Sequence, residues 1–284
     1  MATAEGAIEP PARGRLIVCA TPIGNLGDVT ARVLDALREA DAIACEDTRR
    51  TRVLLERYEI AGTLVSYHEH NERERAAELV GQIARGALVA LVSDAGMPLV
   101  SDPGYKLVRA CIEAELAVEA LPGASSVTTA IAVAGLPAER WRFVGFLPRK
   151  RAELERVLID TPETLVAFES PRRLAATLSV LAERDPDRPT VVCRELTKLH
   201  EEVRRGGAAE LAAHYAEHSP RGEIVLVVGG AARSDVDRNA ALTALRALVD
   251  AGARARPAAT VVAKLTGVSA NQLYGDLTNS QKGS

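Results

Sequence analysis

The sequence contains no run of about 18 uncharged apolar residues, the length that a helix needs to span a membrane. Its first 14 residues are mixed in charge and contain proline, so they lack the apolar segment of a secretory signal. We therefore expect a cytoplasmic protein with no membrane partner, in which residues 1–14 form a disordered leader.

The chain also lacks CxxC pairs, although it has four cysteines. Three of them lie in apolar runs of strand-like character, so we expect reduced thiols in the core rather than a zinc site or a disulfide framework. His68 and His70 share one face of a strand-like segment, but no third metal ligand is evident beside them. The sequence thus predicts no bound metal. The cysteines are Cys19, Cys45, Cys111 and Cys193.

Three common site motifs are missing. The loop after the first apolar run has only Gly24 and Gly27, so the GxGxxG fingerprint of dinucleotide-binding folds is not met. The absence of GxxxxGK[ST] and of GxSxG argues against a Walker-type nucleotide site and an α/β-hydrolase. The net charge of −3 argues against a general nucleic-acid coat, but local basic patches can still bind RNA.

What the sequence does contain is a regular alternation of apolar runs and amphipathic segments. Its 284 residues suggest roughly two domains at about 150 residues each. The apolar runs of the first half are almost free of polar residues, which is typical of a parallel sheet covered by helices on both faces. We expect strands at 16–20, 42–45, 64–66, 88–92 and 118–121, and helices at 30–40, 48–58, 72–85 and 105–114.

The alternation of apolar runs and amphipathic segments is interrupted at Pro122 and Gly123. The connection between the apolar runs 190–194 and 201–204 is too short for a helical crossover, so this pair should be antiparallel and the second sheet mixed. Ser170 and Pro171 are expected to begin a helix as its N-cap and first residue. The expected strands are 142–145, 164–168, 190–194, 201–204 and 223–228, and the expected helices are 124–134, 151–159, 172–184 and 208–216.

Three short helices are expected near the C-terminus, with Gly267 ending the second and Ser269 capping the third. Such a helix-turn-helix-like module could touch nucleic acid or equally cap a dimer. The fold class is therefore α/β, with two α/β domains, a mostly parallel first sheet, a mixed second sheet and a small C-terminal helical module. The expected divisions are a leader (1–14), two domains (15–122 and 123–230), a linker (231–238), the helical module (239–278) and a tail (279–284).

Three loops rich in Gly, Pro, Ser and Asp follow apolar runs. In open α/β sheets, ligands bind at the carboxyl ends of the strands, so three such loops together indicate a ligand site, although any one of them could be a plain turn. The loops are residues 21–28, 93–104 and 121–126.

Charged motifs leave two interpretations open. In residues 46–52, Asp47 or Thr48 can cap a helix while the arginines either lie in solvent or bind phosphate. The basic run 149–151 stands at an expected helix start, where it opposes the helix dipole, so we expect it to have a partner.

Seven of these motifs occur in an order that resembles the bacterial small-subunit ribosomal RNA 2′-O-ribose methyltransferases, within the tetrapyrrole methylase superfamily. The resemblance covers residues 15–228, together with a match of the small C-terminal module. The motifs are TPIGN (21–25), EDTR (46–49), SDAGMP (93–98), SDPG (101–104), PGASS (122–126), FESPRR (168–173) and RELTK (194–198).

The resemblance implies S-adenosylmethionine as methyl donor, bound between two α/β domains, and S-adenosylhomocysteine as product. It implies as acceptor the 2′-hydroxyl of cytidine 1402 in the decoding centre of 16S rRNA, on the small ribosomal subunit, and a homodimer. The donor-binding positions that carry over are Pro22, Ile23, Gly24, Asn25, Asp94, Ala95, Gly96, Met97, Pro98, Ser125, Ser126, Phe168, Leu196 and Glu223.

A 2′-hydroxyl is a weak acid, so a base or a polarising cation would assist its methylation. The catalytic candidates are Glu46, Asp102, His68, Glu169 and Lys198, with Glu195 beside them. The candidates for RNA phosphate contacts are Arg49, Arg149, Lys150, Arg151, Arg172 and Arg173. Two alternatives stay open at this stage: methylation of a tetrapyrrole or other small acceptor, and a donor-binding RNA-binding protein without catalysis.

Overall fold

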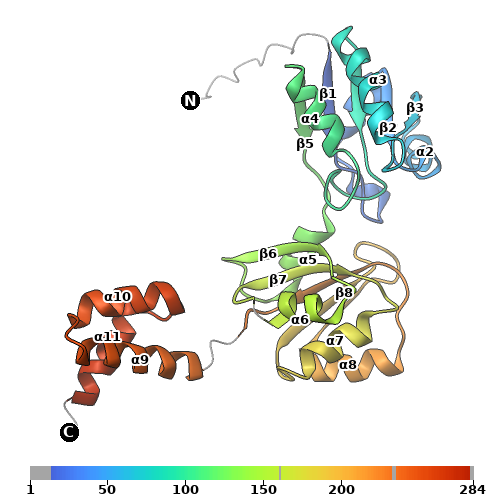
Figure 1. The fold of residues 1–284 in the computed structure, drawn as a ribbon. Coiled ribbons are helices and arrows are strands. Elements are labelled where there is room, and N and C mark those ends of the chain that lie inside the picture. Colours follow the sequence, from blue (N-terminus) through green and yellow to red (C-terminus); the bar gives the residue numbers. More distant parts are fainter. Residues whose placement is uncertain (1–13, 160, 232–234, 282–284) are drawn as a thin grey trace, which may run out of the picture. The chain divides into compact units, whose positions relative to one another are not determined.

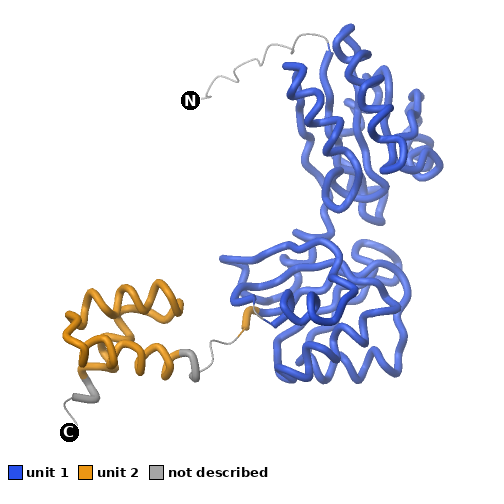
Figure 2. Tube along the Cα trace, in the orientation of Figure 1, with its two compact units in different colours: residues 1–229 blue, residues 230–284 orange. Residues whose placement is uncertain are grey.

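The computed structural model describes residues 14–159, 161–231 and 235–281. The chain divides into two units, Met1–Gly229 and Gly230–Ser284 (Figure 2). The first unit holds two five-stranded sheets, and the described part of the second is helical (Figure 1).

The first sheet is entirely parallel and has the strand order β3-β2-β4-β1-β5. Long crossovers connect its strands, as parallel pairing requires. The strands are β1 (Arg15–Cys19), β2 (Ala42–Cys45), β3 (Leu64–Ser66), β4 (Leu88–Leu91) and β5 (Ala117–Leu121). The helices are α1 (Ala31–Glu39), α2 (Thr48–Arg57), α3 (Glu72–Ala84) and α4 (Tyr105–Glu113), and a 3-10 turn, η1, spans Leu26–Asp28.

Both faces of the first sheet are buried. Ile17 and Cys19 of β1 pack with α1 and α2, whereas the alternate residues Leu16 and Val18 pack with α3 and α4. Successive side chains of a strand point to opposite faces, which is why nearly every position in these strands is apolar. The predicted parallel sheet with two covered faces is thereby confirmed.

The second sheet is mixed and has the order β6-β7-β10-β8-β9. Only β6 and β7 pair in parallel, and the predicted hairpin is the antiparallel pair β8–β9. The strands are β6 (Trp141–Phe146), β7 (Thr164–Glu169), β8 (Pro189–Arg194), β9 (Glu202–Gly207) and β10 (Ile224–Val228). The helices are α5 (Ser126–Ala134), α6 (Arg151–Ile159), α7 (Leu174–Ala182) and α8 (Ala208–Glu217).

Helices cover both faces of this sheet as well. Helices α6, α7 and α8 pack against one face, and α5 packs against the other through Val127 and Ala130. Ile23, from the loop after β1, lies in the same cluster as α5. An apolar side chain of the first ligand loop therefore belongs to the core of the second sheet.

The second unit has its own apolar core around Leu245, Val262 and Leu273. Its helices are α9 (Asp235–Asp250), α10 (Ala255–Thr266) and α11 (Ala270–Gln281). Gly267 ends α10 in the left-handed conformation (φ 71°), as its C-cap position predicted.

Several expected boundaries differ from the observed ones. Helix α9 begins at Asp235, inside the expected linker, and α11 continues to Gln281, inside the expected tail. Ser170 and Pro171 do not begin a helix: they form a turn, because the Ser170 carbonyl accepts hydrogen bonds from the amides of Arg173 and Leu174, and α7 starts at Leu174. The expected leader lies outside the described residues except for Gly14.

All four cysteines are free and buried, as expected. Among the helices that the structure describes, none combines the length and the apolarity needed to cross a bilayer.

Candidate active site

The ligand loops follow three neighbouring strands, because β4, β1 and β5 are adjacent in the sheet. The first two loops are joined: Thr21 and Gly96 exchange backbone hydrogen bonds of 2.8 and 3.1 Å, and the Thr21 hydroxyl donates to the Ser93 carbonyl at 3.0 Å. Gly96 has φ +79°, a left-handed backbone conformation that favours glycine, and an added Cβ would lie 3.3 Å from Ile23 Cγ2.

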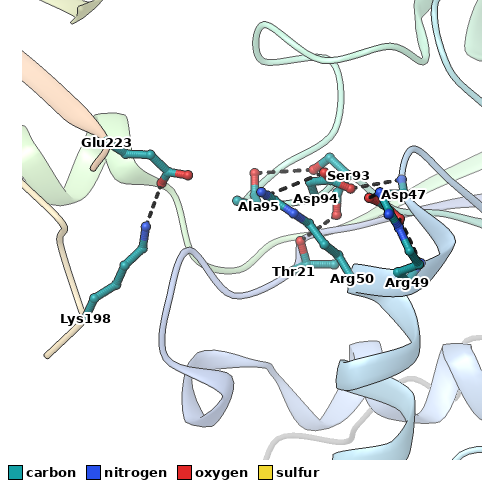
Figure 3. Close-up of polar contacts among 9 residues, drawn as sticks. All are labelled: Thr21, Asp47, Arg49, Arg50, Ser93, Asp94, Ala95, Lys198 and Glu223. Carbon is teal, nitrogen blue, oxygen red and sulfur yellow. Dashed lines mark hydrogen bonds and ion pairs between the residues drawn. The ribbon is translucent and has the colours of Figure 1, made fainter. Parts of the chain in front are cut away.

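Asp94 joins the loop after β4 to the start of α2 (Figure 3). Its Oδ1 accepts the Asp47 amide at 3.0 Å, and its Oδ2 lies 3.5 Å from Arg50. Asp47 caps α2 by accepting the Arg49 amide at 2.9 Å. Hydrogen bonds from Arg49 lower the pKa of Asp47 to about 2, so the cap is ionised at neutral pH. The EDTR motif is therefore held against the SDAGMP loop.

The surroundings of the Asp102 carboxyl raise its pKa. Burial, followed by the negative charge of Glu46, raises its pKa to about 6, with a contribution from Asp94. The pKa of Glu46 is itself raised, by burial and by Asp94. A carboxylate with a pKa near neutrality is a suitable proton acceptor.

The loop that carries Asp102 has an unusual backbone. Leu99 and Ser101 have φ values of 72° and 67°, in the left-handed region that side chains with a Cβ rarely adopt. The buried carboxylate of Glu72 accepts the Gly104 amide at 3.3 Å, where the loop meets α4. Such conformations persist only where the surroundings fix them, so the loop is pre-formed.

The second half of the site is the loop between β8 and β9. Lys198 Nζ lies 2.8 Å from Glu195 and 3.0 Å from Glu223. The Asn25 amide donates to the Thr197 hydroxyl at 3.2 Å, and a Cβ added to Gly24 would come 2.4 Å from Lys198 Cγ. The backbone of Gly24 thus lies against the Lys198 side chain, which brings the first ligand loop against the RELTK loop.

Between these loops lies a pocket of about 410 Å³. Six of the expected donor-binding residues and two catalytic candidates, Asp102 and Glu169, contribute to its walls. The six are Ile23, Ala95, Ser126, Phe168, Leu196 and Glu223. A second pocket of about 260 Å³ is lined by Pro22, Gly24, Asp94 and Lys198, and shares Ile23, Ala95 and Glu223 with the first.

Five expected donor-binding residues line neither pocket: Asn25, Gly96, Met97, Pro98 and Ser125. Gly96 and Asn25 instead hold the loops together through their backbones. Met97 packs into the core beside α3 and α4. Gly96, Asn25 and Met97 therefore hold the loops of the site in place.

Glu169 and Arg173 are committed to contacts inside the fold. The Glu169 carboxylate is fully buried and accepts the Ser170 amide at 2.6 Å and the Thr177 hydroxyl at 2.5 Å. Arg173 donates to the carbonyls of Leu147 and Pro148 at 3.1 and 2.6 Å. These contacts favour structural roles over the catalytic and RNA-binding roles considered from the sequence.

His68 lines neither pocket. Its amide donates to the Asn71 side chain at 2.9 Å, and its ring meets the His70 ring edge-on at 5.9 Å. In the described part of the chain, its Nδ1 is buried without a hydrogen-bond partner. A positive charge on His68 lowers the pKa of Glu46, but burial, Asp94 and Arg50 all have larger effects on that pKa.

The remaining basic candidates are exposed. Arg49 pairs with Asp47, Lys150 lies 3.4 Å from Glu153, and Arg151 pairs with Glu155 at 2.8 Å and with Glu183. Arg149 and Arg172 are also exposed. Exposed ion pairs are weak, so these side chains stay available to phosphates.

Arg50 and Phe146 are among the pocket-wall residues that were not predicted as site residues from the sequence. Arg50 lines the smaller pocket, although its EDTR neighbours drew attention to Arg49. Phe146 lines the larger one and is 64% exposed, with its ring 5.3 Å from that of Phe168. The signal in the sequence for Phe146 was its place as an aromatic residue at the end of an apolar run.

Comparisons with known proteins agree with this geometry. The family model described as "Tetrapyrrole (Corrin/Porphyrin) Methylases" matches residues 15–212. The chain is 45% identical over 276 residues to "Ribosomal RNA small subunit methyltransferase I" of Mycobacterium tuberculosis, covering 95% of this chain and 96% of that protein. The chain belongs to this methyltransferase family, within the tetrapyrrole methylases.

A second member of the methyltransferase family, from Thermotoga maritima, is 46% identical over 219 residues, which are 76% of this chain and 99% of that protein. Among solved structures, uroporphyrin-III-C-methyltransferase from Thermus thermophilus has a TM-score of 0.57 at 24% identity, covering 76% of this chain and 94% of that one. Diphthine synthase has the same TM-score at 17% identity, covering 76% and 90%. At these identities the structures support the fold alone, which is the predicted one.

Proposed function

We propose that this protein methylates the 2′-hydroxyl of a cytidine, position 1402, in the decoding centre of 16S rRNA on the small ribosomal subunit, with S-adenosylmethionine as donor. The observation that carries the proposal is 45% identity over nearly the whole length of both this chain and a ribosomal RNA small subunit methyltransferase I. The proposed target implies a cytoplasmic location.

The larger pocket suits the donor chemically. Apolar side chains such as Leu196 and Val225 offer surfaces to an adenine ring, and the hydroxyls of Ser101 and Ser126 offer hydrogen bonds to a ribose. The carboxylates of Asp102 and Glu223 give the walls negative charge, which favours a cationic ligand. When bound, S-adenosylmethionine supplies a methyl group already activated by its sulfonium charge.

Asp102 is the proposed base. Above pH 6 its carboxylate is ionised and can accept the proton of the ribose hydroxyl as the oxygen gains its methyl group. The strained loop from Leu99 to Gly104 holds this carboxylate, and orientation of the reacting groups supplies much of the rate in such displacements. Glu46 is assigned the role of raising the pKa of Asp102.

RNA binding is proposed for the exposed basic side chains, and a homodimer for the assembly. Phosphate contacts fix the position of an RNA without reading its sequence, so binding should weaken as salt rises. Mass measurement in solution tests the dimer. The proposed contacts are Arg49, Arg149, Lys150, Arg151 and Arg172.

The test uses tritium-labelled S-adenosylmethionine with small ribosomal subunits from cells that lack this protein. Naked 16S rRNA and a porphyrinogen serve as alternative acceptors, and the Asp102→Asn variant serves as the control without a base. Label in subunit RNA, at a ribose whose 3′ linkage resists alkaline cleavage, would support the proposal.

Other outcomes would point elsewhere. Label only in the porphyrinogen would show that the protein methylates a tetrapyrrole or another small acceptor. Tight donor binding without turnover on any acceptor would indicate a non-catalytic protein that binds both donor and RNA.

A further inference from the structure

The smaller pocket lies beside the donor pocket and has a different chemistry. It shares Ile23, Ala95 and Glu223 with the larger pocket, so the two are adjacent. Two cationic side chains from different elements, Arg50 of α2 and Lys198 of the β8–β9 loop, contribute to its walls. Figure 3 shows these two side chains with their carboxylate partners, Asp94 and Glu223.

The Arg50 guanidinium has N–H donors that can bind an anion. Its side chain is 62% exposed, and the ion pair that the described residues give it, to Asp94, spans 3.5 Å. A guanidinium carries five N–H donors in a planar fork, and one long contact leaves most of them free. Asp94 does not depend on Arg50 for a partner, because its other oxygen accepts the Asp47 amide.

Lys198 has one fixed and one replaceable partner. Glu195 is 19% exposed and also accepts the Glu223 amide at 2.9 Å, so backbone and side chain both hold it. Glu223 is 63% exposed, and its carboxylate lies 3.0 Å from Lys198 Nζ. An anion entering the pocket can take the place of the Glu223 carboxylate without disturbing the Glu195–Lys198 pair.

The pocket is also close to the proposed base in electrostatic terms. The positive charge of Arg50 lowers the pKa of Glu46, and the negative charge of Glu46 raises the pKa of Asp102. In a ribonucleotide, the 2′-hydroxyl and the 3′-phosphate stand on neighbouring carbons of the ribose. A nucleotide that brings its 2′-hydroxyl to Asp102 therefore carries a phosphodiester within a few bonds of it.

We propose that the smaller pocket binds the phosphodiester next to the target ribose, with Arg50 and Lys198 as its two cationic contacts. The proposal rests on the proposed function and adds to it an acceptor subsite. Arg50 makes the directional, bidentate contact, and Lys198 exchanges Glu223 for the phosphate.

The experiment compares Arg50→Gln with Arg52→Gln, which removes an exposed arginine two residues along the same helix that lines neither pocket. The measurements are the KM for small subunits, the dissociation constant of S-adenosylhomocysteine and the salt dependence of subunit binding. Arg50→Gln should raise the KM about tenfold or more, leave the dissociation constant within twofold and reduce the salt slope by about one phosphate contact. Arg52→Gln should change none of these, and Arg50→Lys should give an intermediate KM.

A second arm tests the pocket without methyl transfer. Cytidine 3′-phosphate and cytidine are titrated into the complex with S-adenosylhomocysteine, and binding is followed by NMR. The wild type should bind the phosphorylated ligand more tightly, and Arg50→Gln should lose that preference. This arm separates a wrong acceptor subsite from a wrong target, because it requires no ribosomal subunit.

Two results would overturn the acceptor subsite. An unchanged subunit KM in Arg50→Gln, with the wild type active, would remove Arg50 from RNA binding and leave the proposed function standing. Weaker S-adenosylhomocysteine binding with an unchanged KM would show that the pocket takes the carboxylate of the donor instead.

Discussion

Glu72 and Lys106 form an ion pair of 2.9 Å beneath the loop that carries Asp102. The Glu72 side chain is only 8% exposed, and its second oxygen accepts the Gly104 amide. One buried carboxylate thus fixes both the end of the strained loop and the first turn of α4. The pair links the stability of the first domain to the geometry of the proposed base.

Replacing Glu72 by Gln is expected to destabilise the protein by about 1–3 kcal/mol, because it removes charge-assisted hydrogen bonds from a buried site. Burial raises the pKa of Glu72, but hydrogen bonds from Lys106 and Gly104 outweigh it and leave the pKa lowered. The stabilisation is therefore present above the unfolded pKa of about 4.3 and is lost as pH falls through the folded pKa. Urea unfolding should show the variant and the wild type converging in acid; a constant difference down to pH 3 would contradict this linkage.

The pH dependence of methyl transfer tests Asp102 and Glu46 together. With a pKa of about 6, Asp102 should give kcat/KM an acid limb near pH 6, and Asp102→Asn should lower kcat by about 10²–10⁴-fold and remove the limb. Glu46→Gln removes a neighbouring negative charge, so the pKa of Asp102 should fall and the limb should move to lower pH. A limb that stays near pH 6 in Glu46→Gln would show that the charge of Glu46 does not set this pKa.

The same raised pKa predicts an opposite effect on stability. A carboxyl whose folded pKa lies above its unfolded value destabilises the folded state as pH rises through that range. Asp102→Asn should therefore raise the melting temperature at pH 8 relative to the wild type, with a smaller difference at pH 4. A variant that is inactive yet more stable would separate the catalytic role from a structural one.

The sequence predicted the elements well and placed three loops after β1, β4 and β5, because fully apolar strands and Gly-Pro loops are local signals. Ile17 and Leu16 lie on opposite covered faces as their run indicated. What it could not predict depends on contacts distant in sequence. Glu169 was a catalytic candidate in the sequence, but in the structure its two oxygens accept hydrogen bonds from Ser170 and Thr177. Arg50 became a pocket residue only because the start of α2 is held against the loop after β4, where Asp94 accepts the Asp47 amide.

Gly222→Ala should disturb the Lys198 loop. Gly222 has φ +91°, and an added Cβ would come 2.4 Å from Cδ of Glu195. The backbone strain is expected to cost about 1–3 kcal/mol, and the clash should push Glu195 away from Lys198. Gly252→Ala is the matched control, because Gly252 has φ +93° and nothing lies within 4 Å of its added Cβ. Both variants should lose stability by urea unfolding, but only Gly222→Ala should also lose methyl transfer; equal activity in the two would show that the Glu195–Lys198 pair is dispensable.

Arg188 is expected to be irreplaceable by Lys at the end of the second sheet. Its buried guanidinium donates to the Gly229 carbonyl at 2.6 Å and to the Thr161 carbonyl at 3.2 Å, and pairs with Asp185 at 3.4 Å. An ammonium is a point charge and cannot span three acceptors that a planar fork reaches, so Arg188→Lys should lose about 1.5–3 kcal/mol for each bond broken. Arg184→Lys, at an exposed position four residues earlier, should be neutral. The difference in urea midpoint between the two variants measures the effect, and equal midpoints would mean that the directional contacts of the Arg188 guanidinium do not contribute to stability.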